Sequence, residues 1–570
     1  MKVTMKSPAS DAPAGRYRLM QQKVRDLLGQ FRHDERGALI VFGLILFTLM
    51  VMMGGLAVDL MRHERTRTEL QQTLDRSVLA ASSLKQTLNP KDVVKDYFAK
   101  AGMSEYLSEP VVGGDGVTYR SVTATATADT KPFFMHMMGI GQFDATVSSA
   151  AEQGISNIEV AMVLDISGSM QNTPSRIANL RIAAKKFVAT VLNNDPEGRT
   201  SISLVPYNGQ VNVGPVLFPK YTTTYNQNFP NSLCIDVPTS TYTSTALSKN
   251  LPMPQSGHFD SFSSSSQSTS YVALQGPTIS SGIYSNNWCQ PVLANIVRPS
   301  QNNIGVLQGY IENLVAVGAT SIDLGMKWGV TMLDPGTRPV IASLAGSNGI
   351  PAAFADRPMD YPMDNPDVSV MKFIILMSDG EHFTEERLND GYRTDPSPIY
   401  KSNNDGYYSI YHPSKVATGK PYWVPHRNSG AGEWRALPWT KSDDSGTYTR
   451  FDWNTLWQVA RVKWVAWQLY ARALGTTSST RTAQYDTRMD TFRTQTPTTE
   501  MDDRLQDVCN AAKSKNIVVF TIAFEAPTNG QTQLRNCATS NSHYFPASGT
   551  QIGTAFDAIA AQIGHLRLTQ

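Results

Sequence analysis

The stretch IEVAMVLDISGS, residues 158–169, decides the fold of this chain. Its first part, Ile158–Leu164, is a short and largely apolar run, which predicts a strand buried on both faces of a sheet. Its second part, Asp165-Ile166-Ser167-Gly168-Ser169, is a tight glycine-containing turn in which one carboxylate and two hydroxyls alternate. We therefore expect the oxygens of Asp165, Ser167 and Ser169 to converge at the end of that strand.

Two later segments supply further oxygen ligands. Thr320 lies in Gly318-Ala319-Thr320-Ser321, and Asp379 follows the apolar run Phe373–Met377 in Ser378-Asp379-Gly380. Two Ser, one Thr and two Asp offer oxygen only, which favours Mg²⁺, Mn²⁺ or Ca²⁺ over zinc or copper. The alternative for the turn at 165–169 alone is an Asx-type turn that caps a helix.

Together the three segments resemble the metal-ion-dependent adhesion site of a von Willebrand factor type A domain. The resemblance implies that Ser167, Ser169 and Thr320 bind the metal directly, and that Asp165 and Asp379 act largely through water. It also implies one open coordination position, which takes a carboxylate from a partner. Such a chain grips a ligand through a metal and is not a conventional enzyme.

Strands alternate with helices through residues 155–570, which predicts an α/β fold with a doubly wound, mostly parallel sheet. Ligands of such sheets bind at the carboxyl ends of the strands, where Asp165 and Asp379 are expected. Two insertions interrupt the pattern, at 208–300 and 383–450. Expected strands are Ile158–Leu164, Thr200–Tyr207, Phe373–Met377, Ile517–Phe524 and His543–Phe545; expected helices are Arg176–Leu192, Gly305–Val317, Ser321–Leu333, Asp502–Lys513 and Thr554–Leu566.

The two insertions and the cysteines give further expectations. Aromatic residues crowd the second insertion, where they suit recognition of sugar or protein or fill a small core of their own. Wide spacing in an oxidising compartment suggests the pairs Cys234–Cys289 and Cys509–Cys537, although four cysteines allow three pairings. A stripe of tryptophans on a predicted helix at Trp453–Leu474 is expected to be buried core rather than a partner surface. Its members are Trp453, Trp457, Trp464 and Trp467.

An uncharged segment of 21 residues, 38–58, is long enough to cross a bilayer as a helix and too long for the apolar region of a signal peptide. Eight Lys and Arg against four acids precede it, whereas the next twenty residues carry four of each. This asymmetry predicts a single-pass protein of the inner (cytoplasmic) membrane. The basic segment 1–37 would be cytoplasmic, and the bulk of the chain would be periplasmic.

The helix is expected to continue beyond the membrane as a stalk over 59–90. Residues 34–84 resemble the N-terminal segment of TadG-like proteins of tight-adherence (Flp) pilus systems, through DERGA at 34–38, GLAVD at 55–59 and TELQQTLD at 68–75. Phe42 stands where pilin-like relatives carry Glu, which argues against prepilin-type processing at Gly37. The alternative is a generic single-span anchor.

Residues 91–152 are expected to form a small α+β region. Residues 117–126 and 143–148 alternate in the manner of strands. Between them lies an aromatic and methionine cluster, which we expect to pack over the sheet rather than bind a partner. Its members are Phe133, Phe134, Met135, Met137 and Met138.

Catalytic signals are weak, and a net charge of +2 gives no basic field for nucleic acid. The sequence contains no H-E-x-x-H, no phosphate-binding loop and no G-x-S-x-G. The leading hypothesis is a membrane-anchored pilus-assembly or adhesion protein that binds other pilus-assembly components or a surface ligand through Mg²⁺. The alternatives are a structural scaffold with a purely stabilising metal, and a metal-assisted hydrolase acting at Asp165 and Asp379.

Overall fold

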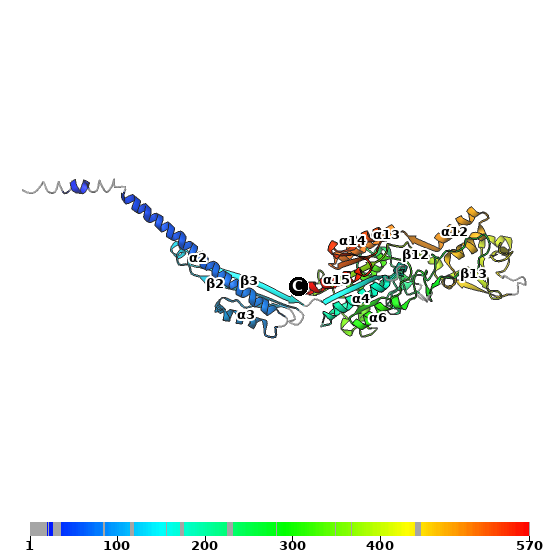
Figure 1. Ribbon diagram of the computed structural model, residues 1–570, viewed down its shortest axis with the longest axis horizontal. Helices are drawn as coiled ribbons and strands as arrows, with labels where there is room; N and C mark the ends of the chain where they lie inside the picture. The colour runs from blue at the N-terminus through cyan, green and yellow to red at the C-terminus, as the bar shows by residue number, and fades with distance from the viewer. Residues whose placement is uncertain are drawn as a thin grey trace, which may run out of the picture. The chain divides into compact units, whose positions relative to one another are not determined.

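The computed structural model describes residues 20, 22–26, 36–83, 86–113, 119–154, 157–171, 176–195, 197–224, 232–280, 282–347, 349–365, 368–438 and 446–568. The chain divides into two compact units, Met1–Gly154 and Ile155–Gln570 (Figure 1). Each unit is described by itself below.

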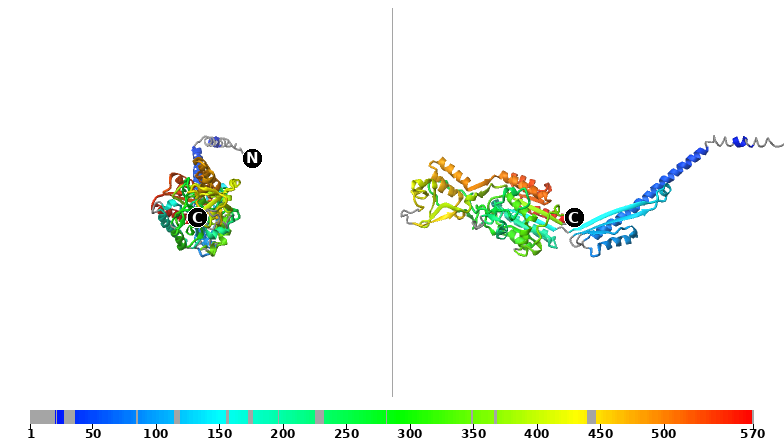
Figure 2. Two further views of the ribbon diagram at one scale, coloured as in Figure 1. Left: turned by 90° about the vertical axis from the view of Figure 1, so that its right-hand side faces the viewer. Right: turned by 180° about the vertical axis from the view of Figure 1, so that it is seen from behind.

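The first unit combines one long helix with a small sheet. Helix α2 runs from Arg36 to Ser82, and a second helix, α3, from Pro90 to Lys100. Strands β1 (Val111–Gly113), β2 (Tyr119–Thr130) and β3 (Phe143–Gly154) form an antiparallel sheet in that order. Figure 2 shows the hairpin of β2 and β3 lying along α2.

The two halves of α2 have different surroundings. Among the described residues it is the one helix long and apolar enough to cross a membrane, with a window of mean hydropathy 2.5 that is 6% buried. Its second half instead buries Leu70, Leu74, Val78 and Ala81, which recur at helical spacing, against the sheet and α3. The helix therefore joins an exposed apolar segment to the core of the first unit.

Two expectations for this unit are wrong. The helix ends at Ser82 rather than near residue 90. Arg120 donates hydrogen bonds to the carbonyl oxygens of Ser83 (2.7 Å) and Gln86 (3.2 Å), and Asn89 caps a new helix that begins at Pro90. The aromatic and methionine cluster does not pack over the sheet; Met137, for example, is 84% exposed. Side chains of α2 and α3 already cover that face of the sheet.

The second unit is built on a six-stranded sheet with the order β10-β5-β4-β11-β19-β20. All neighbours pair in parallel except β10, which runs antiparallel to β5 at one edge. The expected mixed α/β class is confirmed. The strands are β4 (Asn157–Asp165), β5 (Thr200–Tyr207), β10 (Arg298–Gln301), β11 (Val370–Ser378), β19 (Val518–Phe524) and β20 (Tyr544–Ala547).

Helices cover both faces of this sheet. Alternate residues of β4 enter two separate cores: Val163 packs in the core that contains Trp328, and Met162 in the core that contains Phe187. Burial on both faces explains why the strand reads as a continuous apolar run. The first core includes α7 (Ile322–Thr331), α13 (Thr498–Ser514) and α14 (Thr528–Cys537); the second includes α4 (Arg176–Asn193), α6 (Ile304–Glu312) and α15 (Gln551–Leu568).

The first insertion and the segment after α7 contain mostly irregular chain and short elements. The first insertion ends as β10 joins the edge of the main sheet. The short elements are α5 (Gly214–Leu217), β6 (Thr223–Thr224), β7 (Met253–Pro254), β8 (Ile279–Ser280), β9 (Ile283–Tyr284) and α8 (Arg338–Ala342).

The second insertion ends later than the expected residue 450. Strand β12 (Glu385–Leu388) pairs with β18 (Arg493–Thr496), so the chain leaves and re-enters the core there. Between them lie a five-stranded sheet and a helical part. They comprise β13 (Pro396–Ser402), β14 (Tyr408–Tyr411), β15 (Tyr422–Val424), β16 (Glu433–Arg435), β17 (Tyr448–Asp452), α9 (Trp453–Trp457), α10 (Val462–Trp464), a π-helix (Val465–Ala471), α11 (Arg472–Leu474) and α12 (Ser478–Phe492).

The tryptophan stripe forms the core of this insertion, as expected. Trp457 and Trp464 are fully buried, and Trp453 and Trp467 are 4% exposed. The single helix expected over Trp453–Leu474 is instead divided into four pieces by the turn before α10 and by the π-helix.

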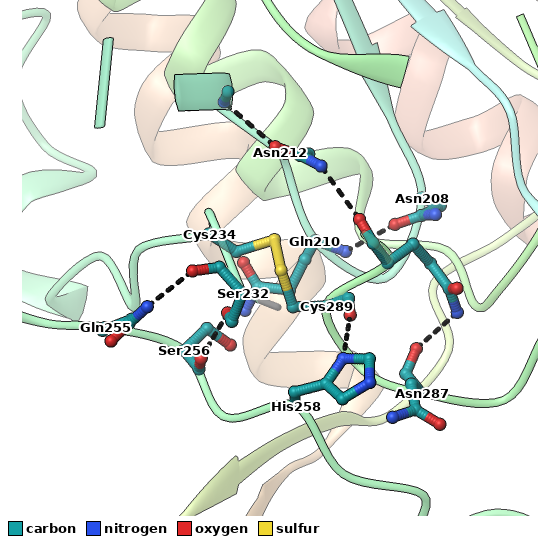
Figure 3. Close-up of a disulfide and its surroundings, with 12 residues drawn as sticks. Asn208, Gln210, Asn212, Ser232, Cys234, Gln255, Ser256, His258, Asn287 and Cys289 are labelled. Carbon is teal, nitrogen blue, oxygen red and sulfur yellow. Dashed lines mark hydrogen bonds between the residues drawn. A yellow bond between two sulfur atoms is a disulfide. The ribbon is translucent and has the colours of Figure 1, made fainter. Parts of the chain in front are cut away.

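Both expected disulfides are present. Cys234 and Cys289 join two parts of the first insertion, with 6.0 Å between their Cα atoms, and His258 Nδ1 lies 3.1 Å from the carbonyl oxygen of Cys289 (Figure 3). Cys509 of α13 and Cys537 at the end of α14 are 5.2 Å apart at Cα. The second bond ties two helices that cover the same face of the sheet.

Replacing Cys509 and Cys537 together by Ala should lower the free energy of unfolding by about 3–4 kcal/mol, because the bond closes a loop of 28 residues in the unfolded chain. Denaturant unfolding of the second unit, monitored by tryptophan fluorescence, measures the change. An unaltered transition, or free thiols at these positions in the unmodified protein, contradicts the assignment.

Candidate metal centre

The pairing of β4 with β11 brings two acidic loops together. The strands are parallel neighbours, and Leu164 stands opposite Met377 in their register. Asp165 ends β4, and Asp379 follows the last residue of β11. Because the carboxyl ends of parallel strands meet at one edge of a sheet, both carboxylates lie at the same place.

Asp379 and the two serines form a contiguous set of oxygens. Ser169 Oγ donates to Asp379 Oδ1 at 2.7 Å, and Ser167 Oγ lies 3.5 Å from the same oxygen. The two hydroxyl oxygens are 2.9 Å apart. The two serine hydroxyls of the turn at 165–169 therefore converge on Asp379, which follows β11.

Two hydrogen bonds hold the Asp165 carboxylate next to that cluster. Its Oδ1 accepts the backbone N–H of Ser167 at 2.8 Å, and its Oδ2 accepts the hydroxyl of Ser378 at 2.6 Å. The hydrogen bond from Ser167 N to Asp165 closes an Asx-type turn. The turn that the alternative describes and the cluster of oxygens are therefore present together. Asp165 is therefore placed to orient the loop as much as to offer an oxygen.

Thr320 belongs to the same place. The carbonyl of Gly318 accepts the N–H of Gly168 at 2.9 Å, and a Cβ atom at Gly380 would lie 3.9 Å from Thr320 Oγ1. Thr320 is buried, at 7% exposed, because the backbone of Phe383 closes over it and donates to its carbonyl oxygen.

Charge in the centre is unbalanced. Asp165 is fully buried and Asp379 is 2% exposed. Burial and the nearby Asp379 carboxylate raise the pKa of Asp165 to about 7, although hydrogen bonds from Ser378 and Ser167 oppose the rise. A divalent cation among these oxygens would relieve the repulsion, and the donor set of hydroxyls and carboxylates fits a hard ion.

Arg176 is a component that the sequence did not reveal. Its Nη1 lies 2.7 Å from Asp379 Oδ2, and its Nε lies 2.8 Å from Glu525 Oε2. Arg176 is the first residue of helix α4, and no spacing pattern in the sequence links it to Asp379. By holding one oxygen of Asp379, it leaves the other directed at the serines.

A hollow of about 200 Å³ adjoins the centre. Gly318 and Ala319, which precede Thr320, line it together with Phe262 and Phe383. Phe262 belongs to the first insertion and Phe383 to the loop between β11 and β12, and their rings meet edge to face with centroids 4.9 Å apart. The first insertion and the loop that leads to the second therefore both contribute to the surface beside the candidate metal ligands.

Comparisons with known proteins concern each end of the chain. Residues 37–83 match the family model described as putative Flp pilus-assembly TadE/G-like, which confirms the TadG-like resemblance of this segment. The chain thus carries a pilus-assembly segment on a helix that is long and apolar enough to be a membrane anchor. No curated protein gives a significant match.

Several solved structures of pilus proteins are similar at low identity. The vWF domain of the type V pili tip protein Mfa5 from Porphyromonas gingivalis is 14% identical, covers 72% of this chain and 97% of its own, and has a TM-score of 0.30. The adhesive tip pilin GBS104 from Group B Streptococcus agalactiae is 10% identical over 72% and 99%, with a TM-score of 0.29. The pilus adhesin SpaC from Lactobacillus rhamnosus GG is 11% identical over 80% and 34%, with a TM-score of 0.27.

Replacing Asp379 by Asn should weaken Mg²⁺ binding by roughly 10–100-fold, the range typical for loss of a group that orients or charges a metal site. Titration calorimetry of the purified chain measures the affinity. Asp557→Asn is the matched control, because this carboxylate is 42% exposed and pairs with Lys186 on the surface. Equal Mg²⁺ affinity in the unmodified chain and an Asp165→Ala, Asp379→Ala double variant would falsify the metal assignment.

Proposed function

We propose that this chain is a membrane-anchored pilus-assembly protein whose second unit is a doubly wound type A domain that binds a protein or surface ligand through Mg²⁺, with Mn²⁺ or Ca²⁺ as substitutes. The observation that carries the proposal is the convergence of five oxygen-bearing side chains at the carboxyl edge of the parallel sheet. They are Asp165, Ser167, Ser169, Thr320 and Asp379.

Each residue of the proposed site has a separate role. Ser167 and Ser169 present hydroxyls beside one oxygen of Asp379, and Arg176 holds the other oxygen in place. Asp165 fixes the serine turn through Ser167 N. When bound, the metal supplies a positive site for a carboxylate of the partner, and the adjoining hollow, which Phe262 and Phe383 help to line, offers apolar contact to the residue that carries it.

A scaffold with a purely stabilising metal is the second candidate. Burial favours it: Asp165, Ser167 and Asp379 are at most 2% exposed, so most of the centre faces the protein. Ser169, which is partly exposed, gives the centre its contact with solvent. The two functions therefore differ in whether a partner reaches the metal through that opening.

Placement in the inner membrane, with the second unit outside the cytoplasm, completes the proposal. Helix α2 has the length and apolarity of a span, and the basic residues gather before it. The Flp pilus-assembly match at 37–83 coincides with this helix. The partner expected at such a site is another pilus-assembly component or a surface ligand that offers a carboxylate.

Capture of membrane-extract proteins by the immobilised chain tests the adhesion function. Binding should fall on chelation with EDTA, return with Mg²⁺, and fall in Ser169→Ala but not in the control Ser542→Ala, whose serine is exposed elsewhere on the second unit. If chelation lowers the melting temperature of the chain while leaving captured proteins unchanged, the scaffold function holds instead.

Protease added to spheroplasts should degrade the second unit and the part of the first unit beyond residue 58, and leave a small fragment that contains residues 1–58. The physical reason is that the charge asymmetry across 38–58 keeps the N-terminus inside. Immunoblotting with antibodies against each end of the chain measures the fragment. Full protection of the second unit contradicts the orientation.

A further inference from the structure

The connection between β2 and β3, KPFFMHMMGIGQ at residues 131–142, exposes more apolar surface than the end of a solvated hairpin requires. Its apolar tip consists of Phe133, Phe134, Met137 and Met138, which are 68%, 38%, 84% and 55% exposed. The segment contains no acidic residue. Single exposed apolar side chains are ordinary, but four within six residues mark a contact surface.

Asp59 fixes the position of the apolar tip along α2. Its carboxylate is 1% exposed and accepts the backbone N–H groups of Phe133 (2.9 Å), Phe134 (2.8 Å) and Met135 (2.9 Å). Hydrogen bonds to a charged acceptor are among the stronger ones, so three together hold the tip in one register. The ring of Phe134 lies over Gly55, where a Cβ atom would come 2.3 Å from its Cγ.

This register places the apolar tip beside the end of the predicted membrane span. Val58 is the last residue of the uncharged run, and Gly55 and Asp59 bracket it within about one helical turn of 5.4 Å. The side chains of Phe47, Met50 and Met53 on the preceding part of α2 are exposed as well, at 64%, 69% and 69%. The apolar tip and the predicted span therefore form one continuous apolar surface.

A cation marks the polar side of this boundary. The guanidinium of Arg62 lies 4.2 Å from the centroid of the Phe133 ring. Arg62 follows the span by one turn, and a basic side chain there suits the anionic headgroups above the acyl region. An apolar loop with a flanking cation and no acid is the composition of a segment that lies in a lipid interface.

We propose that the apolar tip inserts into the headgroup–acyl boundary of the leaflet from which α2 emerges, so that the bilayer is its partner. This inference rests on the proposed anchoring of α2 in the membrane. Interfacial segments bury their apolar side chains about 5–10 Å deep, which a loop held beside Gly55 reaches. Because Asp59 joins the tip to α2, this second contact fixes how the first unit is oriented on the membrane.

Spin labels in the full chain test the proposal. All four native cysteines are paired, so Met137→Cys can be labelled alone and the chain reconstituted at low density into vesicles of phosphatidylcholine with phosphatidylglycerol. The label should show severalfold lower collision with a water-soluble nickel chelate, and higher collision with oxygen, than a label at Leu79→Cys. Leu79 is a matched control, 69% exposed on the same helix but roughly 30 Å beyond the span.

Each outcome decides a separate point. Equal chelate access at residues 137 and 79 overturns the lipid contact of the tip. Protection of residue 137 that disappears on further dilution of the protein in lipid assigns the tip to a second copy of the chain, and also overturns it. A third label, at Leu46→Cys, reports on the span: chelate access there refutes the anchor itself, and with it both proposals.

The role of Asp59 gives an independent check. Asp59→Asn keeps the size of the side chain but weakens the three hydrogen bonds that hold the tip. The label at residue 137 should then become more mobile and severalfold more accessible to the chelate, while the label at residue 79 stays unchanged. An immobile, protected label in this variant contradicts the positioning role of Asp59.

Discussion

The parallel pairing of β4 with β11 is the interaction on which the rest of the second unit depends. Eight residue pairs in register, from Asn157–Val370 to Leu164–Met377, set the ends of both strands at one level. Asp165 and Ser378 consequently meet although 213 residues separate them in the chain. Helices bury both faces of these strands and hold the carboxyl edge of the sheet in place. The loops that follow β4 and β11 can therefore carry charged side chains.

The loop from Asp379 to Glu385 is fixed at both ends, and this gives the candidate centre its rigidity. Arg176 holds Asp379, and Arg504 of α13 lies 2.8 Å from Glu385, where β12 and the second insertion begin. Between them the N–H of Phe383 donates to Thr320. Burial lowers the pKa of the intervening His382 to about 3, so this side chain is neutral and adds no cation to the centre. A candidate site held by its neighbours in this way would need little reorganisation to bind a metal ion.

The sequence predicted those parts of the structure that local pattern controls. Asp165 and Asp379 were correctly placed at strand ends because each follows a short apolar run, whose length favours a strand covered on both faces. Arg176 was missed because a long side chain that spans two loops leaves no periodic signal. The end of the second insertion was missed because β12 and β18 are short and polar, and only their pairing reveals them. The tip at 133–138 was placed in a core because apolar composition alone does not distinguish burial in a protein core from exposure at the surface.

Charge balance separates the candidate metal centre from two other buried acids, Glu159 and Asp59. Glu159, near the start of β4, is as buried as Asp165 at the end, but it faces two cations, Lys372 at 2.6 Å and Arg357 at 3.6 Å. Asp59 of the first unit has its charge spread over three backbone N–H groups. At the carboxyl end of β4, by contrast, Arg176 pairs with Asp379 and Glu525, whereas Asp165 is held by the N–H of Ser167 and the hydroxyl of Ser378. Buried carboxylates without matching positive charge are costly, so the proposed divalent cation would stabilise this end of the strand, whereas Glu159 at the other end already faces two cations.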